Sequence, residues 1–245
     1  VSLALTAQHH RIPVLSDGHF RDGDVQHPCP LAEEVFVMKH YIETEIIPRY
    51  EAFDKAHRTG HVLQVIAQSI KLARHYEVDE RMVYAIAACH DIGLCEGREH
   101  HHLVSGRLVR EDGNLRKWFT EEEIEVMAQA VEDHRASLGH PPRSIYGRIV
   151  AEADRLIDPM TVLLRTVQYG LSHYPELSKE ERYRRYCEHL QEKYAEGGYL
   201  KLWIPESDNA SRLAELRALI ADEARKREAF EQIYQSEYSS SPAMY

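Results

Sequence analysis

Cysteine is scarce in this chain, and long apolar runs are absent from it. The four cysteines among 245 residues form no CxxC pair and no dense framework; they are Cys29, Cys89, Cys95 and Cys187. This distribution excludes a disulfide-rich scaffold and predicts free thiols in a reducing cytoplasm. No stretch approaches the roughly 18 unbroken apolar residues that a membrane span requires. The opening segment VSLALTAQHHRIPVL has no basic region and no clear cleavage site, so we expect no secretory signal.

A large excess of one charge is also missing. The 30 Lys and Arg residues and the 40 Asp and Glu residues give a net charge of −10, and both signs are mixed along the chain. Broad binding to a nucleic-acid backbone needs a positive surface, so we expect no nucleic-acid partner. Alternating apolar and polar residues are almost absent as well. The segment GYLKLWIP, residues 198–205, is the best candidate for an extended strand.

The periodicity that is present is helical from Ala32 onward. The spacing of apolar residues predicts helices near residues 33–54, 60–76, 80–92, 99–110, 121–134, 143–157, 160–172, 178–195 and 209–234. Proline and glycine interrupt residues 1–31, which we expect to form an irregular leader. The prediction is an all-α protein with a helical domain over residues 32–175. Residues 176–245 form a helical extension that packs on this domain or on a partner subunit.

Start and stop signals support several of these helices. Asp79 is a good N-cap for the helix that follows it, and Gly93 marks the end of that helix. Thr120 precedes Glu121, Glu122 and Glu123, which places acids at the positive end of the helix dipole.

Histidine is abundant, with sixteen in the chain, and several occupy unexpected positions. Five predicted helices carry a histidine or an aspartate on the side that faces the core; these residues are His61, His90 with Asp91, His101, His134 and Asp154. Such groups cost free energy in an apolar interior unless they are paired or bind a metal. Imidazole and carboxylate are ligands of Fe, Mn, Zn and Ni, and no cysteine joins them. The pattern therefore predicts a metal site.

The order of these residues resembles the HD superfamily of metal-dependent hydrolases. The matching segments are GHVLQVI with His61, AACHDIGL with His90 and Asp91, and AEADRLI with Asp154. The resemblance covers roughly residues 33–172. It implies an HD-domain helical bundle in which these four residues bind one divalent cation.

Two further segments resemble those that complete a two-metal centre. HHHLVSG supplies His101, with His102 as the alternative, and VEDHRAS supplies His134. If both carry over, Asp91 is placed to bridge two ions. The chain departs from the pattern at Ser105, where a glycine is usual, and at Asp133–His134, where cyclic-dinucleotide phosphodiesterases have an HHE-like pair. Their GYP signature is absent, so we do not expect a cyclic dinucleotide substrate.

The resemblance implies a phosphohydrolase that uses a metal-activated water on a small phosphorylated metabolite, with a nucleotide as the expected substrate. Arg98, Arg135 and Arg143 are candidates for binding the phosphate, and Glu96 is a candidate proton shuttle beside Asp91. We expect one or two divalent ions, from Fe, Mn, Ni, Zn and Mg. We expect no membrane partner, and the apolar stripe of the last helix is compatible with a homodimer.

Two other functions fit the same residues. HD-type proteins with the two additional histidines include di-iron oxygenases, which iron content and oxygen uptake would reveal. A non-catalytic ligand-binding HD protein is the third candidate. It has no need for a centre that activates water, so the full ligand set argues against it.

Overall fold

The computed structural model describes residues 30–53 and 59–240, and this part of the chain is helical without a strand. The α-helices are α1 (Pro30–Tyr41), α2 (Thr59–Ala73), α3 (Glu80–Cys89), α4 (His101–Glu111), α5 (Glu121–Glu132), α6 (Ile145–Arg155), α7 (Pro159–His173), α8 (Lys179–Lys193), α9 (Asn209–Ala221) and α10 (Glu223–Ser240). The predicted all-α fold is confirmed. No helix among the described residues is long and apolar enough to cross a membrane.

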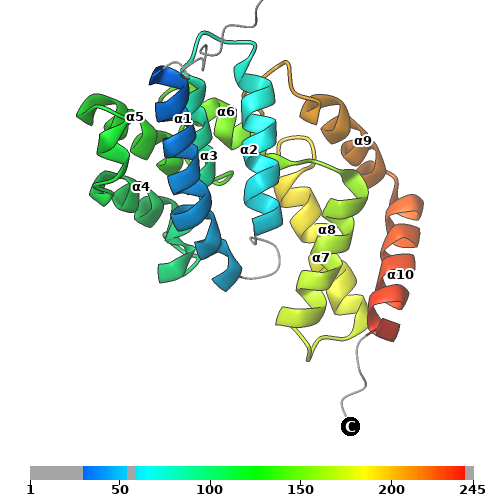
Figure 1. Cartoon of the computed structure of the whole chain (residues 1–245). Coiled ribbons are helices and arrows are strands. Elements are labelled where there is room, and N and C mark those ends of the chain that lie inside the picture. Colours follow the sequence, from blue (N-terminus) through cyan, green and yellow to red (C-terminus); the bar gives the residue numbers. More distant parts are fainter. Residues whose placement is uncertain (1–29, 54–58, 241–245) are drawn as a thin grey trace, which may run out of the picture.

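Helix α3 lies in the larger core behind α1, and α2, α5 and α6 pack against it (Figure 1). Every residue from Met82 to Cys89 is buried, so α3 is covered on all sides. A helix with this burial needs apolar or small residues around its whole circumference, and MVYAIAAC supplies them. Because His90 and Asp91 directly follow α3, they are carried into the interior of the protein.

A second, smaller core is formed by α7 to α10 (Figure 1). It begins at Ile157, directly after α6, and includes Leu163, Leu190, Leu216 and Phe230. The chain turns between the two cores at Leu156, whose φ of 35° lies in the left-handed region that is unusual outside glycine. Helix α7 therefore packs with the C-terminal helices, whereas the sequence predicted that the extension begins at residue 176.

Several predicted signals act as expected. The Asp79 side chain accepts a hydrogen bond from the Arg81 amide and caps α3. Thr120 and Glu123 form a complete capping box at α5. Gly93 is not the helix end, however, because α3 stops at Cys89 and a 3₁₀ turn, η4 (Ile92–Glu96), follows Asp91.

Three other expectations are corrected. The helix predicted over 33–54 leaves α geometry at Ile42 and continues as a π turn, η1 (Ile42–Ile46), and a 3₁₀ turn, η2 (Ile47–Ala52). Pro48 has no amide hydrogen to give to the preceding turn, which explains the change. The helix predicted over 209–234 is two helices that meet at the extended residue Asp222. Residues 198–205 cross between the cores without forming a strand. The predicted leader, residues 1–31, lies almost wholly outside the described residues.

A buried carboxylate joins the two parts of the molecule. Glu152 on α6 is fully buried, and its oxygens accept hydrogen bonds from the backbone amides of Trp203 and Ile204. They also accept from the Ser207 hydroxyl and the Asn209 amide. These four donors replace the water that a carboxylate loses on burial. Glu152 thus fixes the segment before α9 against the larger core.

Candidate metal centre

Six side chains from five helical segments converge in the larger core. His61 lies in the first turn of α2, His90 and Asp91 follow α3, His101 begins α4, His134 follows α5, and Asp154 lies near the end of α6. The sequence predicted all six as metal ligands. The structure brings all of them together in two neighbouring groups.

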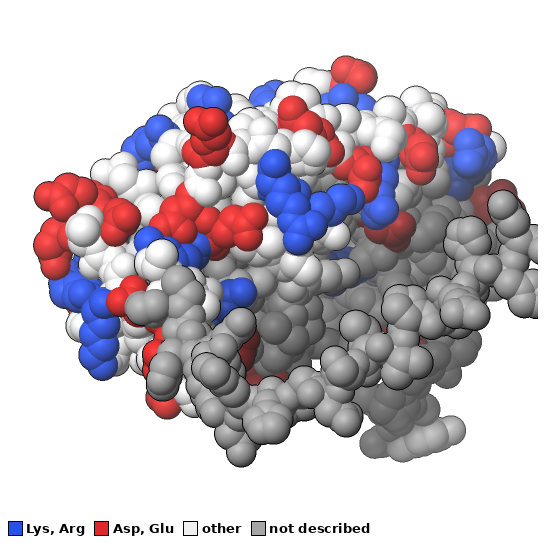
Figure 2. Space-filling model, turned by 45° about the horizontal axis from the view of Figure 1, so that its top comes forward, with Lys and Arg blue, Asp and Glu red and all other residues white. Residues whose placement is uncertain are grey.

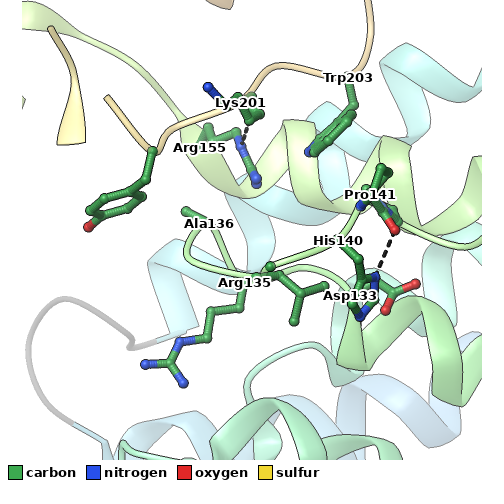
Figure 3. Close-up of a pocket in the computed structure, with 12 residues that line it drawn as sticks. Asp133, Arg135, Ala136, His140, Pro141, Arg155, Lys201 and Trp203 are labelled. Carbon is green, nitrogen blue, oxygen red and sulfur yellow. Dashed lines mark hydrogen bonds between the residues drawn. The ribbon is translucent and has the colours of Figure 1, made fainter. Parts of the chain in front are cut away.

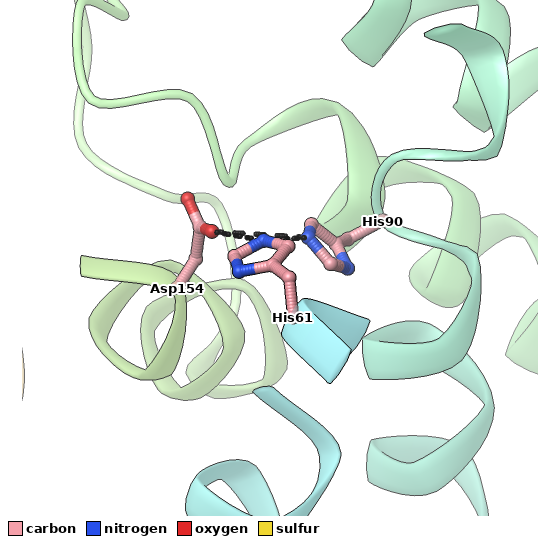
Figure 4. Close-up of side chains that lie close together, drawn as sticks. All are labelled: His61, His90 and Asp154. Carbon is pink, nitrogen blue, oxygen red and sulfur yellow. Dashed lines mark hydrogen bonds and ion pairs between the residues drawn. The ribbon is translucent and has the colours of Figure 1, made fainter. Parts of the chain in front are cut away.

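The first group contains His61, His90 and Asp154 (Figure 4). The Nε2 atoms of His61 and His90 lie 3.3 Å apart. Asp154 Oδ1 lies 3.2 Å from His61 Nε2 and 3.8 Å from His90 Nε2. Three donor atoms thus face one small space, as the ligands of one ion must.

The second group contains Asp91, His101 and His134. Asp91 Oδ1 lies 3.3 Å from the Nε2 atoms of both histidines, and those two nitrogens lie 3.3 Å apart. Of the two histidines that the sequence left open, His101 and not its neighbour His102 lies in this group and could hold an ion there.

Asp91, a member of the second group, also lies beside the first. While Oδ1 faces His101 and His134, the other oxygen, Oδ2, lies 3.3 Å from His90 Nε2 and 3.8 Å from His61 Nε2. The carboxylate is only 4% exposed as a residue, so it has little access to bulk water. One oxygen toward each group is the arrangement of a carboxylate that bridges two cations.

Backbone carbonyls orient three of the four imidazoles. His90 Nδ1 lies 2.7 Å from the Ala87 oxygen, His134 Nδ1 lies 2.6 Å from the Val131 oxygen, and His101 Nδ1 lies 2.8 Å from the Arg98 oxygen. A carbonyl only accepts, so each Nδ1 carries its proton and donates it. The Nε2 lone pair of each ring is then left for a metal, which is the usual support of a histidine ligand.

The charges of the cluster are strongly coupled. Burial lowers the pKa of His90, but the carboxylates of Asp91 and Asp154 outweigh this effect and raise it to about 9. Burial raises the pKa of Asp91, but His90, His101 and His134 outweigh it and hold that pKa well below its usual range. At Asp154, burial raises the pKa, but the hydrogen bond and the charge of His61 outweigh this effect, so the pKa is lowered.

This donor set fits a divalent cation. The buried Asp91 and the partly exposed Asp154 need positive charge beside them, and without an ion only protons on the imidazoles can supply it. Divalent ions can replace those protons while the neutral rings and carboxylates serve as ligands. The residues that would hold one ion are His61, His90, Asp91 and Asp154, and those for a second are Asp91, His101 and His134.

A close approach between the backbones of η4 and α4 holds Asp91 in position. Gly93, two residues after Asp91, donates its amide hydrogen to the Ser105 hydroxyl at 2.8 Å. A Cβ at Gly93 would lie 2.5 Å from the Ser105 amide nitrogen and would also overlap the His101 carbonyl. Gly93 therefore lets η4 approach α4 closely enough for Asp91 and His101 to meet. Ser105 contributes the hydrogen bond.

Two of the other predicted site residues are engaged elsewhere. The Glu96 carboxylate lies 2.6 Å from an Arg107 nitrogen, and its side chain is 52% exposed, which does not support a proton shuttle beside Asp91. The Arg143 guanidinium lies 2.8 Å from Asp133 and 2.7 Å from Glu132. Its charge is already matched by two carboxylates, so the structure does not support Arg143 as a phosphate clamp.

The other two predicted arginines differ in position. Arg98 is exposed, and its backbone oxygen orients His101. Arg135 follows His134 directly, donates to the Glu99 carbonyl at 2.7 Å and lines a pocket of about 320 Å³. Of the predicted arginines, Arg135 is the one that borders both the centre and a cavity.

The pocket contains cationic residues that the sequence did not single out (Figure 3). Arg155, directly after Asp154, donates to the backbone oxygens of His134 and Lys201. Burial lowers the pKa of Arg155. Lys201 and Trp203 line the same pocket from the segment before α9. Adjacency to the Asp154 ligand was a signal for Arg155, but nothing local could place residues 201 and 203 here.

One face of the molecule shows how its surface charges are distributed. Figure 2 shows Lys and Arg side chains interspersed with Asp and Glu over the face that it displays. Several of these charges form pairs, such as Arg110 with Glu125 and Arg116 with Glu121. This face does not present the continuous basic surface that nucleic-acid backbones require.

Comparison with known proteins finds one family model that matches the part of the chain that contains the candidate ligands. Residues 58–157 match the family model of the HD domain, and all six converging residues lie within this range. A crystal structure of a predicted HD superfamily hydrolase from an uncultured Thermotogales bacterium aligns with 66% of this chain and 87% of its own, at 19% identity and a TM-score of 0.41. No curated protein matches this chain significantly.

Proposed function

We propose that this protein is a metal-dependent phosphohydrolase that acts on a small phosphorylated metabolite, with a nucleotide as the expected class. The observation that carries the proposal is the Asp91 carboxylate, which directs one oxygen to each of two His/Asp groups. A divalent ion in such a centre lowers the pKa of a coordinated water and offsets charge on a phosphoryl oxygen. Cationic residues in the adjoining pocket, Arg135 and Arg155 among them, support an anionic substrate.

The protein's own residues have separate tasks in this function. The six ligands fix the position of the ions, and the carbonyls of Ala87, Val131 and Arg98 keep three rings in the tautomer that can bind them. Burial keeps bulk water from Asp91 and His90, which strengthens electrostatic interactions at these two residues.

The test is metal analysis combined with a phosphatase panel. Protein purified without chelator is analysed for metals and assayed with nucleoside mono-, di- and triphosphates and with added Mn, Mg, Fe, Zn or Ni. Asp91→Asn keeps the side-chain volume but removes the bridging charge. We expect it to lose bound metal and more than about a hundredfold of the activity. Asp112→Asn is the control, since Asp112 bonds Tyr41 outside the cluster.

His134→Ala tests the number of ions. His134 belongs to the second group alone, so its loss is expected to reduce two bound ions per chain to one. Full metal occupancy and activity in Asp91→Asn would overturn the proposed centre. A wild-type protein that binds its ions but hydrolyses no phosphate ester would overturn the phosphohydrolase.

A di-iron oxygenase is the second candidate, because four histidines and two aspartates in two groups are also a suitable ligand set for iron. It predicts iron as the bound metal and oxygen uptake with a diol or hydroxyphosphonate, in place of phosphate release.

A further inference from the structure

The pocket beside the metal centre is built from both parts of the molecule. The loop between α5 and α6 contributes Arg135 and His140, the end of α6 contributes Arg155, and the segment before α9 contributes Tyr199, Lys201 and Trp203 (Figure 3). The HD domain match ends at residue 157, so the last three belong to the extension. The pocket and the centre meet at His134, whose ring faces Asp91 and whose backbone oxygen accepts a hydrogen bond from Arg155.

The cationic residues of this pocket have no carboxylate within ion-pair distance among the residues that the structure describes. Arg135, Arg155 and Lys201 donate to the backbone oxygens of Glu99, His134 and Gly198, among others. Within the described part of the chain, none of the three forms an ion pair with a carboxylate. Asp133 also lines the pocket, but its carboxylate is held by Arg143 at 2.8 Å.

This arrangement is unusual for a chain with a net charge of −10. Acidic residues outnumber basic ones, and arginines elsewhere, such as Arg110 and Arg227, each contact two glutamates. Figure 3 shows the Arg135 guanidinium turned away from Arg155 and Lys201. Arg155 and Lys201 line the hollow without carboxylate partners, and an anion from outside would relieve the repulsion between their charges.

The pocket also holds an unused hydrogen-bond donor. The Trp203 indole nitrogen is buried and has no hydrogen-bond partner among the residues that the structure describes. An indole N–H only donates, and a buried donor without an acceptor costs free energy. A ligand oxygen would satisfy it.

We propose that this pocket is the subsite for a second anionic group of the substrate, a phosphate or carboxylate separate from the group at the metal centre. Lys201 and Arg155 bind its charge, and Trp203 donates a hydrogen bond to it. The protein therefore prefers substrates with two or more anionic groups over simple monoesters. This inference rests on the proposed function for the reaction, but the anion site itself can be tested without turnover.

The first experiment measures binding without metal. Calorimetric titration of the chelator-treated full chain with inorganic pyrophosphate reports on the pocket, because the centre then holds no ion. Lys201→Met is expected to weaken binding about tenfold, as loss of one charge-assisted hydrogen bond implies, and Trp203→Phe should also weaken it. Lys71→Met is the matched control, because Lys71 pairs with Asp208 on the surface. Absence of pyrophosphate binding, or equal affinity in Lys201→Met and wild type, would overturn the anion site.

The second experiment measures substrate preference in the metal-loaded enzyme. The readout is the ratio of kcat/KM for a nucleoside triphosphate to kcat/KM for p-nitrophenyl phosphate. We expect Lys201→Met to lower this ratio about tenfold, through KM, and Lys71→Met to leave it at the wild-type value. An unchanged ratio with weakened pyrophosphate binding would mean an anion site outside the substrate path and would overturn the subsite. Pyrophosphate binding without turnover of any phosphate ester would overturn the proposed function and leave the anion site standing.

Discussion

Some residues that are not candidate ligands position the centre through their hydrogen bonds. Tyr50 is an example, since its ring is fully buried in the larger core. Its hydroxyl donates to the Ala88 oxygen at 2.9 Å and accepts from the Asp91 amide at 3.2 Å. Tyr50 thus holds the point where α3 ends and the bridging aspartate begins.

Tyr50→Phe removes both hydrogen bonds while keeping the ring. We expect the free energy of unfolding to fall by about 1–3 kcal/mol, because a buried carbonyl and a buried amide lose their partner. Metal affinity should fall by about tenfold, as for the loss of other groups that orient ligands. Chemical denaturation and metal titration measure the two effects.

Tyr84→Phe is the control for this change, because the Tyr84 hydroxyl bonds Glu43 away from the cluster. It should leave metal affinity unchanged. Equal metal affinity in Tyr50→Phe and wild type would show that Tyr50 does not position Asp91.

The residues that the sequence could identify are those whose helical position conflicts with their polarity. His90 and Asp154 belong to apolar helix faces, so their inward placement followed from periodicity. Glu96 and Arg143 were inferred from proximity in sequence alone, and proximity does not fix direction: both side chains turn to other charged partners. The sequence could not identify Lys201 and Trp203 as pocket residues, because only the packing of the two cores brings them there.

At the scale of elements, the centre depends on how closely η4 and α4 approach. Their contact has no room for a side chain at Gly93. The sequence suggested this glycine as a helix end, and its role proves to be steric. The breaks in the first and last predicted helices had local signals in Pro48 and Asp222, where the Asp222 side chain accepts from the Arg225 amide at 3.1 Å. Because the apolar periodicity continues across both breaks, it predicted one continuous helix in each case.

Gly93→Ala should separate η4 from α4. The new Cβ meets backbone atoms of His101 and Ser105, which cannot rotate away, so we expect a loss of about 3 kcal/mol or more in unfolding free energy. The displaced His101 should also weaken the second group of ligands, which metal counting on the folded fraction can detect.

Gly170→Ala in α7 is the matched substitution, since no atom lies within 4 Å of a Cβ there. It removes a helical glycine and should stabilise the protein by about 0.5–1 kcal/mol. A Gly93→Ala protein as stable as wild type would contradict the steric role.

At the scale of the whole molecule, the larger core holds the ligands and the smaller core holds part of the pocket wall. Glu152 connects them, because its four donors all lie in residues 203–209. Its position on α6, one turn after buried Ile149, was a sign of burial in the sequence. The identity of its partners was not, since they follow about fifty residues later.

Glu152→Gln tests whether this connection positions the pocket. The glutamine NH₂ group would face donors on one side, leaving at least one of them buried and unpaired, so unfolding free energy should fall by about 2–3 kcal/mol. Hydrogen exchange should accelerate in residues 199–209, and pyrophosphate binding should weaken with it. The hydrogen bonds and ion pairs described above for the six candidate ligands involve other segments, so metal content should remain at the wild-type value. Glu188→Gln on exposed α8 surface should change none of these. If Glu152→Gln instead lost metal while residues 199–209 kept their protection, the carboxylate would support α6 and the centre, and the two cores would be held together by their apolar contacts.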